Sequence, residues 1–328
     1  MRFALAVSAL LGTCRPLSAA PVNGAALGLF ASDASYSYEM LLREIAERQA
    51  DDVLLVVPFA QDHFGATEVR FPAELRKATA RAAHTATALG LRVGLMPIIE
   101  VGGDGWRGRL NPGPGLDAWF RSYTQALEAL ARIAEAVGAV RLGLGSELGP
   151  VEAYETHWRA VAAALRALYS GELFYAVNWD RLDEVGFWDA VDAVATSGYF
   201  PLLPAGAVAS AEALDRAWDP RRERLAALAR QTGKHYFFAE VGYPSHRDAA
   251  ARPWAFRSEA PIDLALQATL WRAFCREFKD EPPLMGFYAW NWFGFGGPGD
   301  RSHTPRGKPA AEMLEACWRQ GVGAAHRR

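Results

Sequence analysis

Short apolar runs and longer segments with helical spacing alternate along nearly all of this 328-residue chain. The apolar runs predict eight strands, at 26–31, 53–58, 91–97, 140–145, 173–177, 193–197, 236–239 and 284–289. About eight helical segments are predicted between and after them, at 38–50, 72–89, 116–137, 152–169, 187–191, 212–231, 262–278 and 309–318. Such alternation favours a parallel sheet with crossover helices. Eight units in one unbroken run predict a single α/β domain, a (β/α)8 TIM barrel, rather than an open doubly wound sheet.

The barrel is expected to span residues 21–328 as one catalytic domain, because no linker, low-complexity tract or repeat interrupts the alternation. The segments that follow the predicted strands are long and aromatic, whereas those that precede them are short. Functional residues of such barrels lie at the carboxyl ends of the strands. We therefore look for the site among the loops that follow the strands.

Residues 1–20 have the pattern of a signal peptide. A basic start at Met1-Arg2 is followed by an apolar run over 3–12 and by small residues at 18–20. That run is too short to span a bilayer as a stable helix, and we expect no membrane span later in the chain. The pattern predicts export, to the periplasm or the cell exterior. If the segment is instead a first barrel element or a disordered start, the protein is cytoplasmic.

Net charge and arginine placement argue against a nucleic-acid partner. The formal net charge is −2, and the arginines are scattered over helical segments rather than gathered in a stripe. Eleven tryptophans are more than a core needs, and their flat apolar faces suit sugar rings as well as packing. We therefore expect a polysaccharide or oligosaccharide partner. We also expect a monomer.

The cysteines and the one glycine motif predict no metal and no cofactor. Three cysteines without a CxxC spacing argue against a zinc site and a disulfide framework, and a bridge between Cys275 and Cys317 is left open. Residues 103–108 spell GxGxxG, the pattern of a dinucleotide loop. Such a loop must open a helix, whereas Pro112 and Pro114 follow this one.

Glu147 and Glu240 each close a short apolar run, which is an unusual place for a charge. Burying a carboxylate is costly unless it is partnered or used. Either residue alone could be a helix N-cap partner or a surface charge. Together they follow the fourth and seventh predicted strands, which face each other across a barrel mouth. This placement predicts a pair about 5–5.5 Å apart, as in retaining glycosidases, with Glu147 protonated near neutral pH while Glu240 is ionised.

Several stretches, in order, carry a resemblance to clan A glycoside hydrolases, and specifically to the family 113 β-mannanases. The stretches are Trp106-Arg107-Gly108, 119–123, Gly145-Ser146-Glu147-Leu148, 175–179, 187–189, Tyr199-Phe200-Pro201-Leu202, 240–245, Trp290 and Lys308-Pro309-Ala310. The resemblance spans nearly the whole chain after the N-terminus. It implies a retaining, endo-acting hydrolase of β-1,4-linked mannan or glucomannan that works by double displacement.

The resemblance also implies roles for individual residues. Glu147 is the expected acid/base and Glu240 the nucleophile. Tyr199 matches a tyrosine that hydrogen-bonds the nucleophile, and Trp290 matches the floor of the subsite for the cleaved sugar. Further substrate-binding residues are expected at Trp106, Arg107, Ser146, Asn178, Trp179 and Trp292.

Two departures from the family pattern affect the expected sugar contacts. Most of the clan has Asn before the acid/base, where this chain has Ser146, so Asn178 or Arg107 is expected to reach the sugar 2-hydroxyl. Where the family often has a His after the third strand, this chain has Ile98, which allows a different sugar preference. Two alternatives therefore stay open. One is a glycosidase on another β-linked glycan, such as glucan or a cell-surface polysaccharide. The other is a carbohydrate-binding barrel without turnover, although a binder has no need of Glu147, Glu240 and Tyr199 together.

Overall fold

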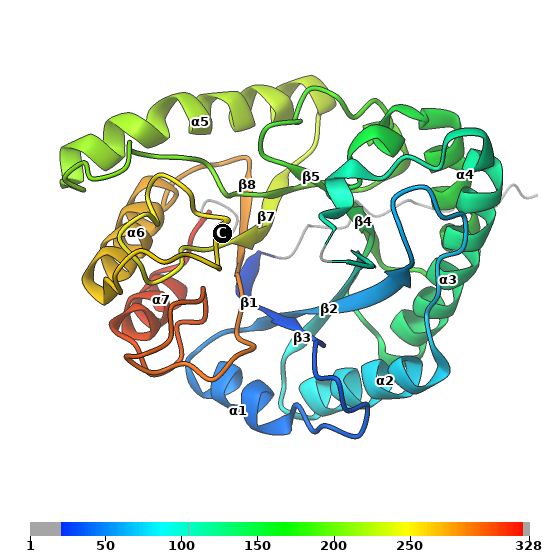
Figure 1. Cartoon of the computed structure of the whole chain (residues 1–328), viewed down its shortest axis with the longest axis horizontal. Helices are drawn as coiled ribbons and strands as arrows, with labels where there is room; N and C mark the ends of the chain where they lie inside the picture. Colours follow the sequence, from blue (N-terminus) through cyan, green and yellow to red (C-terminus); the bar gives the residue numbers. More distant parts are fainter. Residues whose placement is uncertain (1–20, 104, 324–328) are drawn as a thin grey trace, which may run out of the picture.

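Eight parallel strands close into a barrel in the order β1 to β8, with helices around the outside (Figure 1). The computed structural model describes residues 21–103 and 105–323. Each strand pairs with the next, and β1 pairs with β8 to close the sheet. The strands are β1 Val22–Gly28, β2 Asp52–Gln61, β3 Arg92–Val101, β4 Arg141–Ser146, β5 Glu172–Asn178, β6 Ala193–Ser197, β7 Tyr236–Val241 and β8 Leu284–Ala289. The predicted (β/α)8 barrel is thus confirmed.

Seven α-helices cover the barrel in the part of the chain that the structure describes. They are α1 Glu39–Glu47, α2 Ala73–Ala88, α3 Leu116–Val137, α4 Glu155–Arg166, α5 Ala211–Thr232, α6 Leu264–Glu277 and α7 Pro309–Gln320. The helix ends follow from local chemistry. Gly138 and Gly233 end α3 and α5 in the left-handed conformation, while Ser210 and Asp263 cap the starts of α5 and α6 with their side chains.

The connection between β5 and β6 has no α-helix and contains only the short 3-10 helix η4, Trp188–Ala190. Aromatic side chains cover the barrel there instead. The ring of Phe187 stacks on Trp158 of α4 at 5.3 Å and meets Tyr175 of β5 edge-on at 5.1 Å. The short helical turn expected at 187–191 is therefore confirmed. The single helix expected over 152–169 is divided into η3, Gly149–Ala153, and α4.

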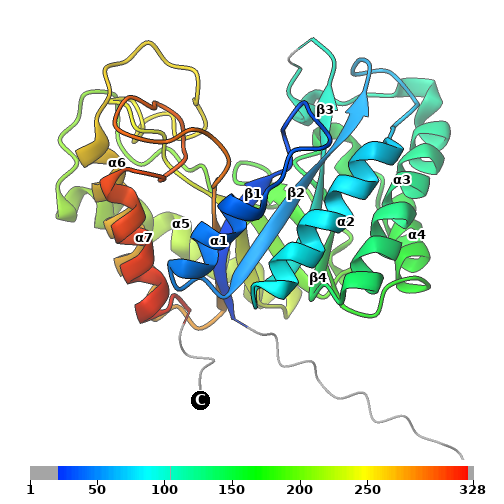
Figure 2. The ribbon, with the colours of Figure 1, turned by 90° about the horizontal axis from the view of Figure 1, so that it is seen from below.

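The amino end of the barrel is closed by a buried charged cluster. Arg141 is almost completely buried and donates a hydrogen bond to the hydroxyl of Tyr288 at 2.8 Å. Its guanidinium also lies 3.2 Å from Glu172 and 3.7 Å from Asp52, and Asp52 pairs with Arg92 at 2.6 Å. Above this cluster, apolar side chains from every strand but β4 fill the interior of the barrel. The interior is therefore closed from the amino end, and the loops that follow the strands gather at the carboxyl end, at the upper edge of Figure 2.

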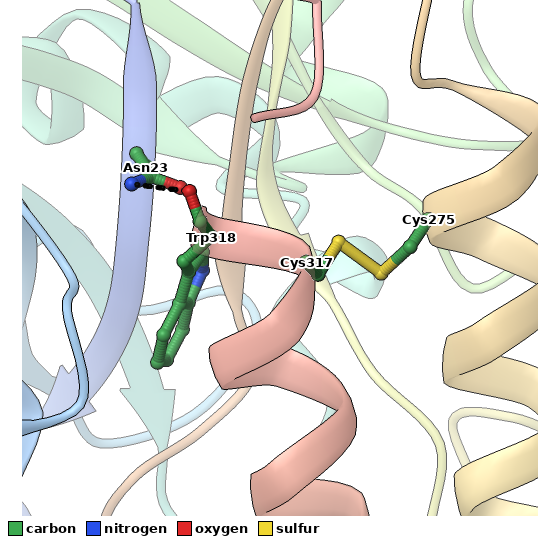
Figure 3. Close-up of a disulfide and its surroundings, with 4 residues drawn as sticks. All are labelled: Asn23, Cys275, Cys317 and Trp318. Atoms are coloured by element: carbon green, nitrogen blue, oxygen red, sulfur yellow. Dashed lines mark hydrogen bonds between the residues drawn. A yellow bond between two sulfur atoms is a disulfide. The ribbon is translucent and has the colours of Figure 1, made fainter. Parts of the chain in front are cut away.

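A disulfide ties the last helix to its neighbour. Cys275 of α6 and Cys317 of α7 are bonded, with their Cα atoms 5.7 Å apart (Figure 3). The adjacent Trp318 accepts a hydrogen bond through its carbonyl from the side chain of Asn23 on β1, at 3.3 Å. The sequence left this bridge open and gave no reason to expect it. The packing of α6 on α7 brings together two cysteines that are 42 positions apart.

The predicted signal peptide at residues 1–20 lies outside the described residues. Among the helices that the structure describes, none is long and apolar enough to cross a membrane.

Candidate active site

Glu147 and Glu240 lie together at the carboxyl end of the barrel, and both are buried, with 6% and 2% of their surfaces exposed. Glu147 directly follows β4, and Glu240 is near the end of β7. One nitrogen of Arg107, Nη2, lies 2.8 Å from Oε2 of Glu147 and 3.5 Å from Oε1 of Glu240. Because both oxygens contact the same nitrogen, they cannot be farther apart than the sum of these two distances. The structure thus brings the two predicted carboxylates face to face around one cation.

The backbone at Glu147 is in the left-handed region, with φ of 54°. This conformation is rare for a residue with a Cβ and costs on the order of 1 kcal/mol, so it persists only where the surroundings impose it. Here the peptide N–H of Glu147 donates to the carbonyl of Ala176 on β5 at 2.9 Å. The register between β4 and β5 shifts just before this point, between Gly143 and Ser146. The bend turns the Glu147 side chain into the mouth of the barrel.

The loop after β3 carries Trp106 and Arg107 against the end of β4. Trp106 donates its indole N–H to Oε2 of Glu147 at 3.3 Å, and Arg107 donates through Nε to the carbonyl of Ser146 at 2.8 Å. The 3-10 helix η1, Arg107–Arg109, packs on η3. At the contact, Gly149 has φ of 57°, and a Cβ added there would lie 2.1 Å from the carbonyl oxygen of Gly108. Only glycine at 149 allows the loop to approach this closely.

Three donors converge on Glu240. Tyr199 donates its hydroxyl to Oε2 at 3.0 Å, and the Ser146 hydroxyl donates to Oε1 at 3.3 Å, the oxygen that also faces Arg107. Burial and the charge of Glu147 nevertheless raise the pKa of Glu240 to about 7, against the opposing effects of Arg107, Tyr199 and Ser146. Although burial disfavours its charge, the two carboxylates hold the pKa of Arg107 above its ordinary value. Sequence reasoning assigned the shared proton to Glu147, whereas the structure raises the pKa of the other member of the pair.

Two adjoining cavities form the cleft over these residues. One of about 480 Å³ contains Glu147 and Glu240 and extends toward Asn178 and Trp179 at the end of β5. The other, of about 960 Å³, extends over the ends of β2 and β3 toward the loop after β8. Their shared wall consists of Trp106, Arg107, Phe256, Trp290 and His303. The carboxylate pair therefore has room for a ligand on both of its sides, as a chain molecule requires.

Most of the residues predicted from the sequence line this cleft. They are Glu147, Glu240, Trp106, Arg107, Asn178, Trp179, Tyr199 and Trp290, and Asp62 and Asp180 also lie in its walls. Asp62 pairs with Arg70 at 2.5 Å.

Two predicted substrate contacts lie elsewhere. Ser146 is fully buried below the cleft, where its hydroxyl contacts Glu240 and Arg107, so it supports the carboxylate pair from behind. Trp292 is also fully buried. Its indole donates to Glu44 at 3.1 Å and packs on Trp318, and the expectation that it lines a subsite is wrong.

In the smaller cavity, which holds the carboxylate pair, sequence reasoning missed the three wall residues Trp254, Phe256 and His303. Trp254 and Phe256 belong to the loop between β7 and α6, and His303 to the loop between β8 and α7. The only signal for them was the length and aromatic content of the loops after the strands. His303, from the loop after β8, lines the same cavity as Ile98.

Comparisons with known proteins agree with this geometry. The profile of Glycoside Hydrolase Family 113 matches residues 26–295. The solved GH113 β-mannanase AaManA from Alicyclobacillus acidocaldarius, in complex with ManMIm, is 27% identical, with a TM-score of 0.83 over 92% of this chain and 97% of that one. A GH113 β-1,4-mannanase, also solved as a complex, is 26% identical, with a TM-score of 0.83 over 92% of this chain and 99% of that one.

More distant structures share the fold alone. A glycoside hydrolase family 5 mannosidase from Rhizomucor miehei is 11% identical, with a TM-score of 0.62 over 92% of this chain and 93% of that one. No curated protein sequence matches this chain. The family profile covers most of the barrel, including both carboxylates and most of the residues that line the cleft. The chain therefore belongs to glycoside hydrolase family 113, and it is a glycoside hydrolase.

Proposed function

We propose that this glycoside hydrolase cleaves β-1,4-mannosidic linkages within mannan or glucomannan chains, with retention of configuration at the cleaved carbon. The family and the two β-mannanases of similar structure support the substrate. The single observation that carries the reaction type is the Arg107 nitrogen shared by Glu147 and Glu240. It holds one oxygen of each carboxylate closer together than the roughly 6.5–9.5 Å at which inverting pairs leave room for a water, which favours a retaining pair.

In the first step, a carboxylate oxygen of Glu240 attacks C1 of the sugar while the bond from C1 to the glycosidic oxygen breaks. Glu147 gives its proton to that oxygen, so the departing chain leaves as a neutral alcohol. Tyr199, Ser146 and Arg107 all donate to Glu240, which favours its ionised, nucleophilic form. The products of this step are a glycosyl ester of Glu240 and an ionised Glu147.

In the second step, Glu147 acts as the base. It removes a proton from water, the water oxygen bonds to C1, and the ester bond to Glu240 breaks. Glu147 is protonated and Glu240 ionised again, so the cycle closes with one proton on the pair. The indole N–H of Trp106 and the guanidinium of Arg107 both point at Oε2 of Glu147, and they stabilise the charge that this residue carries between the two steps.

The shape of the cleft supports cleavage within a chain rather than at its end. Cavities extend from the carboxylate pair in two directions, toward Trp179 and toward the loop after β8. Trp290 lines both cavities beside the carboxylate pair. We propose a monomer. We also propose an exported protein, because disulfides such as that between Cys275 and Cys317 persist in oxidising compartments.

The test is a substrate panel. Reducing ends are followed after incubation of the purified protein with β-1,4-mannan, glucomannan, cello-oligosaccharides and xylan, with Glu240→Gln in parallel. Release that is selective for mannan and absent in the variant supports the proposal. Release only from another glycan would support the proposed reaction but show that the substrate is not mannan. Binding of mannan oligosaccharides without release by the wild type would mean a binding barrel.

A further inference from the structure

Trp254 lies against Trp179 at the rim of the cavity that holds the carboxylate pair. The two indoles are stacked, with centroids 6.0 Å apart and planes inclined by 17°. Trp254 keeps 45% of its surface exposed and lines the cavity together with Glu147 and Asn178. One of its faces therefore rests on Trp179, and the remaining apolar surface is available to a ligand in the cleft.

Two buried histidines hold the backbone on either side of Trp254. His303 contacts the carbonyl of Pro253 through Nε2 at 2.7 Å, and His246 contacts the carbonyl of Ala255 through Nε2 at 2.7 Å. A carbonyl oxygen can only accept, so both imidazoles donate there. The N–H of Asp248 donates to Nδ1 of His246 at 3.2 Å, which is consistent with that tautomer. Both histidines are buried, 4% and 0% exposed.

This arrangement fixes the indole before any ligand binds. A loop residue that is nearly half exposed ordinarily loses conformational freedom when a ligand orders it, and this loss weakens binding. Here the peptides on both sides of Trp254 are anchored by His246 from earlier in the same loop and by His303 from the loop after β8, and the ring itself is stacked on Trp179. The wall of the cleft at this point is a preformed flat surface.

The position of Trp254 relative to Glu147 indicates on which side of the scissile bond Trp254 would contact the substrate. The cavity that contains both carboxylates extends from Glu147, at the end of β4, to Asn178 and Trp179 at the end of the neighbouring strand β5, and Trp254 lies in its wall against Trp179. The larger cavity contains neither Glu147 nor Glu240. A general acid must lie beside the oxygen of the departing sugar. Since that sugar lies on the side of Glu147, the cavity beyond it toward β5 takes the leaving part of the chain.

We propose that Trp254, backed by Trp179, is the stacking platform for a sugar on the leaving-group side of the scissile bond, an inference that rests on the proposed function. The ligand is a β-1,4-linked mannosyl unit. The face of such a ring that carries the axial hydrogens of C1, C3 and C5 is apolar and matches an indole face. The polar edge of the ring then meets Asn178 and Asp180, which line the same cavity.

The experiment compares two substrates that differ in whether they occupy this platform. Mannohexaose places sugars on both sides of the carboxylate pair. β-Mannobiosyl fluoride has a leaving group too small to reach Trp254. For Trp254→Ala we expect kcat/KM to fall about tenfold on mannohexaose, from the lost apolar contact, and to stay within about twofold on the fluoride. Trp254→Phe should recover part of the loss, because a smaller flat ring remains.

Tyr154→Ala is the matched control, since Tyr154 is an aromatic residue with 42% of its surface exposed that lines neither cavity. It should leave both substrates unchanged. Equal losses on both substrates in Trp254→Ala would overturn the proposal and make Trp254 a support of the catalytic pair. Unchanged rates on both would overturn it as well.

The design separates this proposal from the proposed function. If the wild type hydrolyses cello-oligosaccharides instead of mannan, the same comparison is made with cellohexaose and cellobiosyl fluoride. In Trp254→Ala, kcat/KM should again fall about tenfold on the hexaose and stay within about twofold on the fluoride. If the wild type hydrolyses none of these substrates, the affinity of mannohexaose for the wild type and for Trp254→Ala, measured by calorimetry, tests the proposal. An affinity that falls about tenfold supports the platform, whereas equal affinity or no binding contradicts it.

Discussion

Arg107 and Glu147 form an ion pair at 2.8 Å in which both side chains are largely buried. A buried pair of this kind is stable only if its remaining polar atoms are also satisfied. Here the second carboxylate, Glu240, lies on the same guanidinium, and the carbonyl of Ser146 accepts from its Nε. The cation therefore has two functions. It allows two acidic groups to lie close together, and it fixes the loop after β3 to the end of β4.

Replacing Arg107 by Met should reduce kcat/KM on β-mannan by at least about 100-fold, the order of loss seen when a preorganised charged donor is removed from an active site. The guanidinium lowers the pKa of Glu240, so its loss should also move the basic side of the pH profile upward. Steady-state rates between pH 5 and 9 check both effects. A rate within threefold of the wild type, in a variant whose circular dichroism is unchanged, would contradict the role of Arg107.

The pH dependence of activity follows from the pKa of about 7 at Glu240, which burial and the charge of Glu147 cause. The proposed cycle needs one proton on the pair. As pH rises through about 7 that proton is lost, so kcat/KM should fall on the alkaline side with an apparent pKa near 7. A profile that stays flat up to pH 9 would be incompatible with a proton held by the pair.

Glu147→Gln offers the matched test of the same coupling. It removes the neighbouring charge, so the pKa of Glu240 should fall. Hydrolysis of β-mannobiosyl fluoride, which needs little protonation of its leaving group, should persist and lose its alkaline decline. Hydrolysis of mannan should fall by about 100-fold or more. Equal losses on the two substrates would count against Glu147 as the acid.

Stability should depend on pH through Glu240 in the opposite sense from an ordinary ion-paired carboxylate. Its pKa is raised from 4.5 to about 7, so the folded protein binds the proton more tightly than the unfolded chain. The resulting stabilisation is present below about pH 4.5 and is lost as pH rises to about 7. Glu240→Gln cannot ionise, and it should become more stable than the wild type above pH 7, by on the order of 3 kcal/mol.

Urea unfolding of the wild type and of Glu240→Gln at pH 5, 6.5 and 8 measures this difference. The free energy of unfolding of the wild type should decline relative to the variant over that range. A constant difference would mean that the surroundings of Glu240 do not favour its protonated form.

Gly149→Ala should damage the site as well as the fold. An added Cβ meets the carbonyl oxygen of Gly108 at 2.1 Å and also forces a side chain into the left-handed region. Gly138→Ala is the matched control, because Gly138 has φ of +66° at the end of α3 with nothing within 4 Å of the added Cβ. Both variants should lose about 1 kcal/mol from backbone strain. Only Gly149→Ala should also lower kcat, by displacing the loop that carries Arg107. Equal activities in the two variants would contradict this.

The sequence predicted best those features that depend on local patterns. The helix over 116–137 and the strands at 193–197 and 284–289 have the predicted bounds, because an apolar period and a terminal glycine such as Gly138 define them locally. The two carboxylates were found for a related reason. A charge at the end of an apolar strand is visible in the sequence, and the barrel topology then brings β4 and β7 to one mouth.

The sequence failed where contacts join residues that are distant along the chain. The hydrogen bond between His303 and Pro253 links positions 50 apart, and the disulfide links positions 42 apart, in loops and helices that no local pattern pairs. Trp292, which was expected to bind substrate, lies beyond Ala289, the last residue of β8. The strand ends there, so Trp290 and Trp292 need not face the same way, and Trp292 turns into the core. The raised pKa of Glu240 depends on burial and on the charge of Glu147, against three donors, of which the sequence analysis expected only Tyr199 to contact Glu240.

The stereochemistry of the first product tests the central claim most directly. Proton NMR is used to follow the anomeric signals of the reducing ends that the wild type releases from β-1,4-mannan oligosaccharides, in the first minutes before mutarotation. Double displacement through Glu240, with Glu147 as acid and base, predicts that the β-anomer appears first and the α-anomer only later. If the α-anomer appears first, the two carboxylates act by inversion around a water, and Glu240 is not the nucleophile of a retaining pair held together by Arg107.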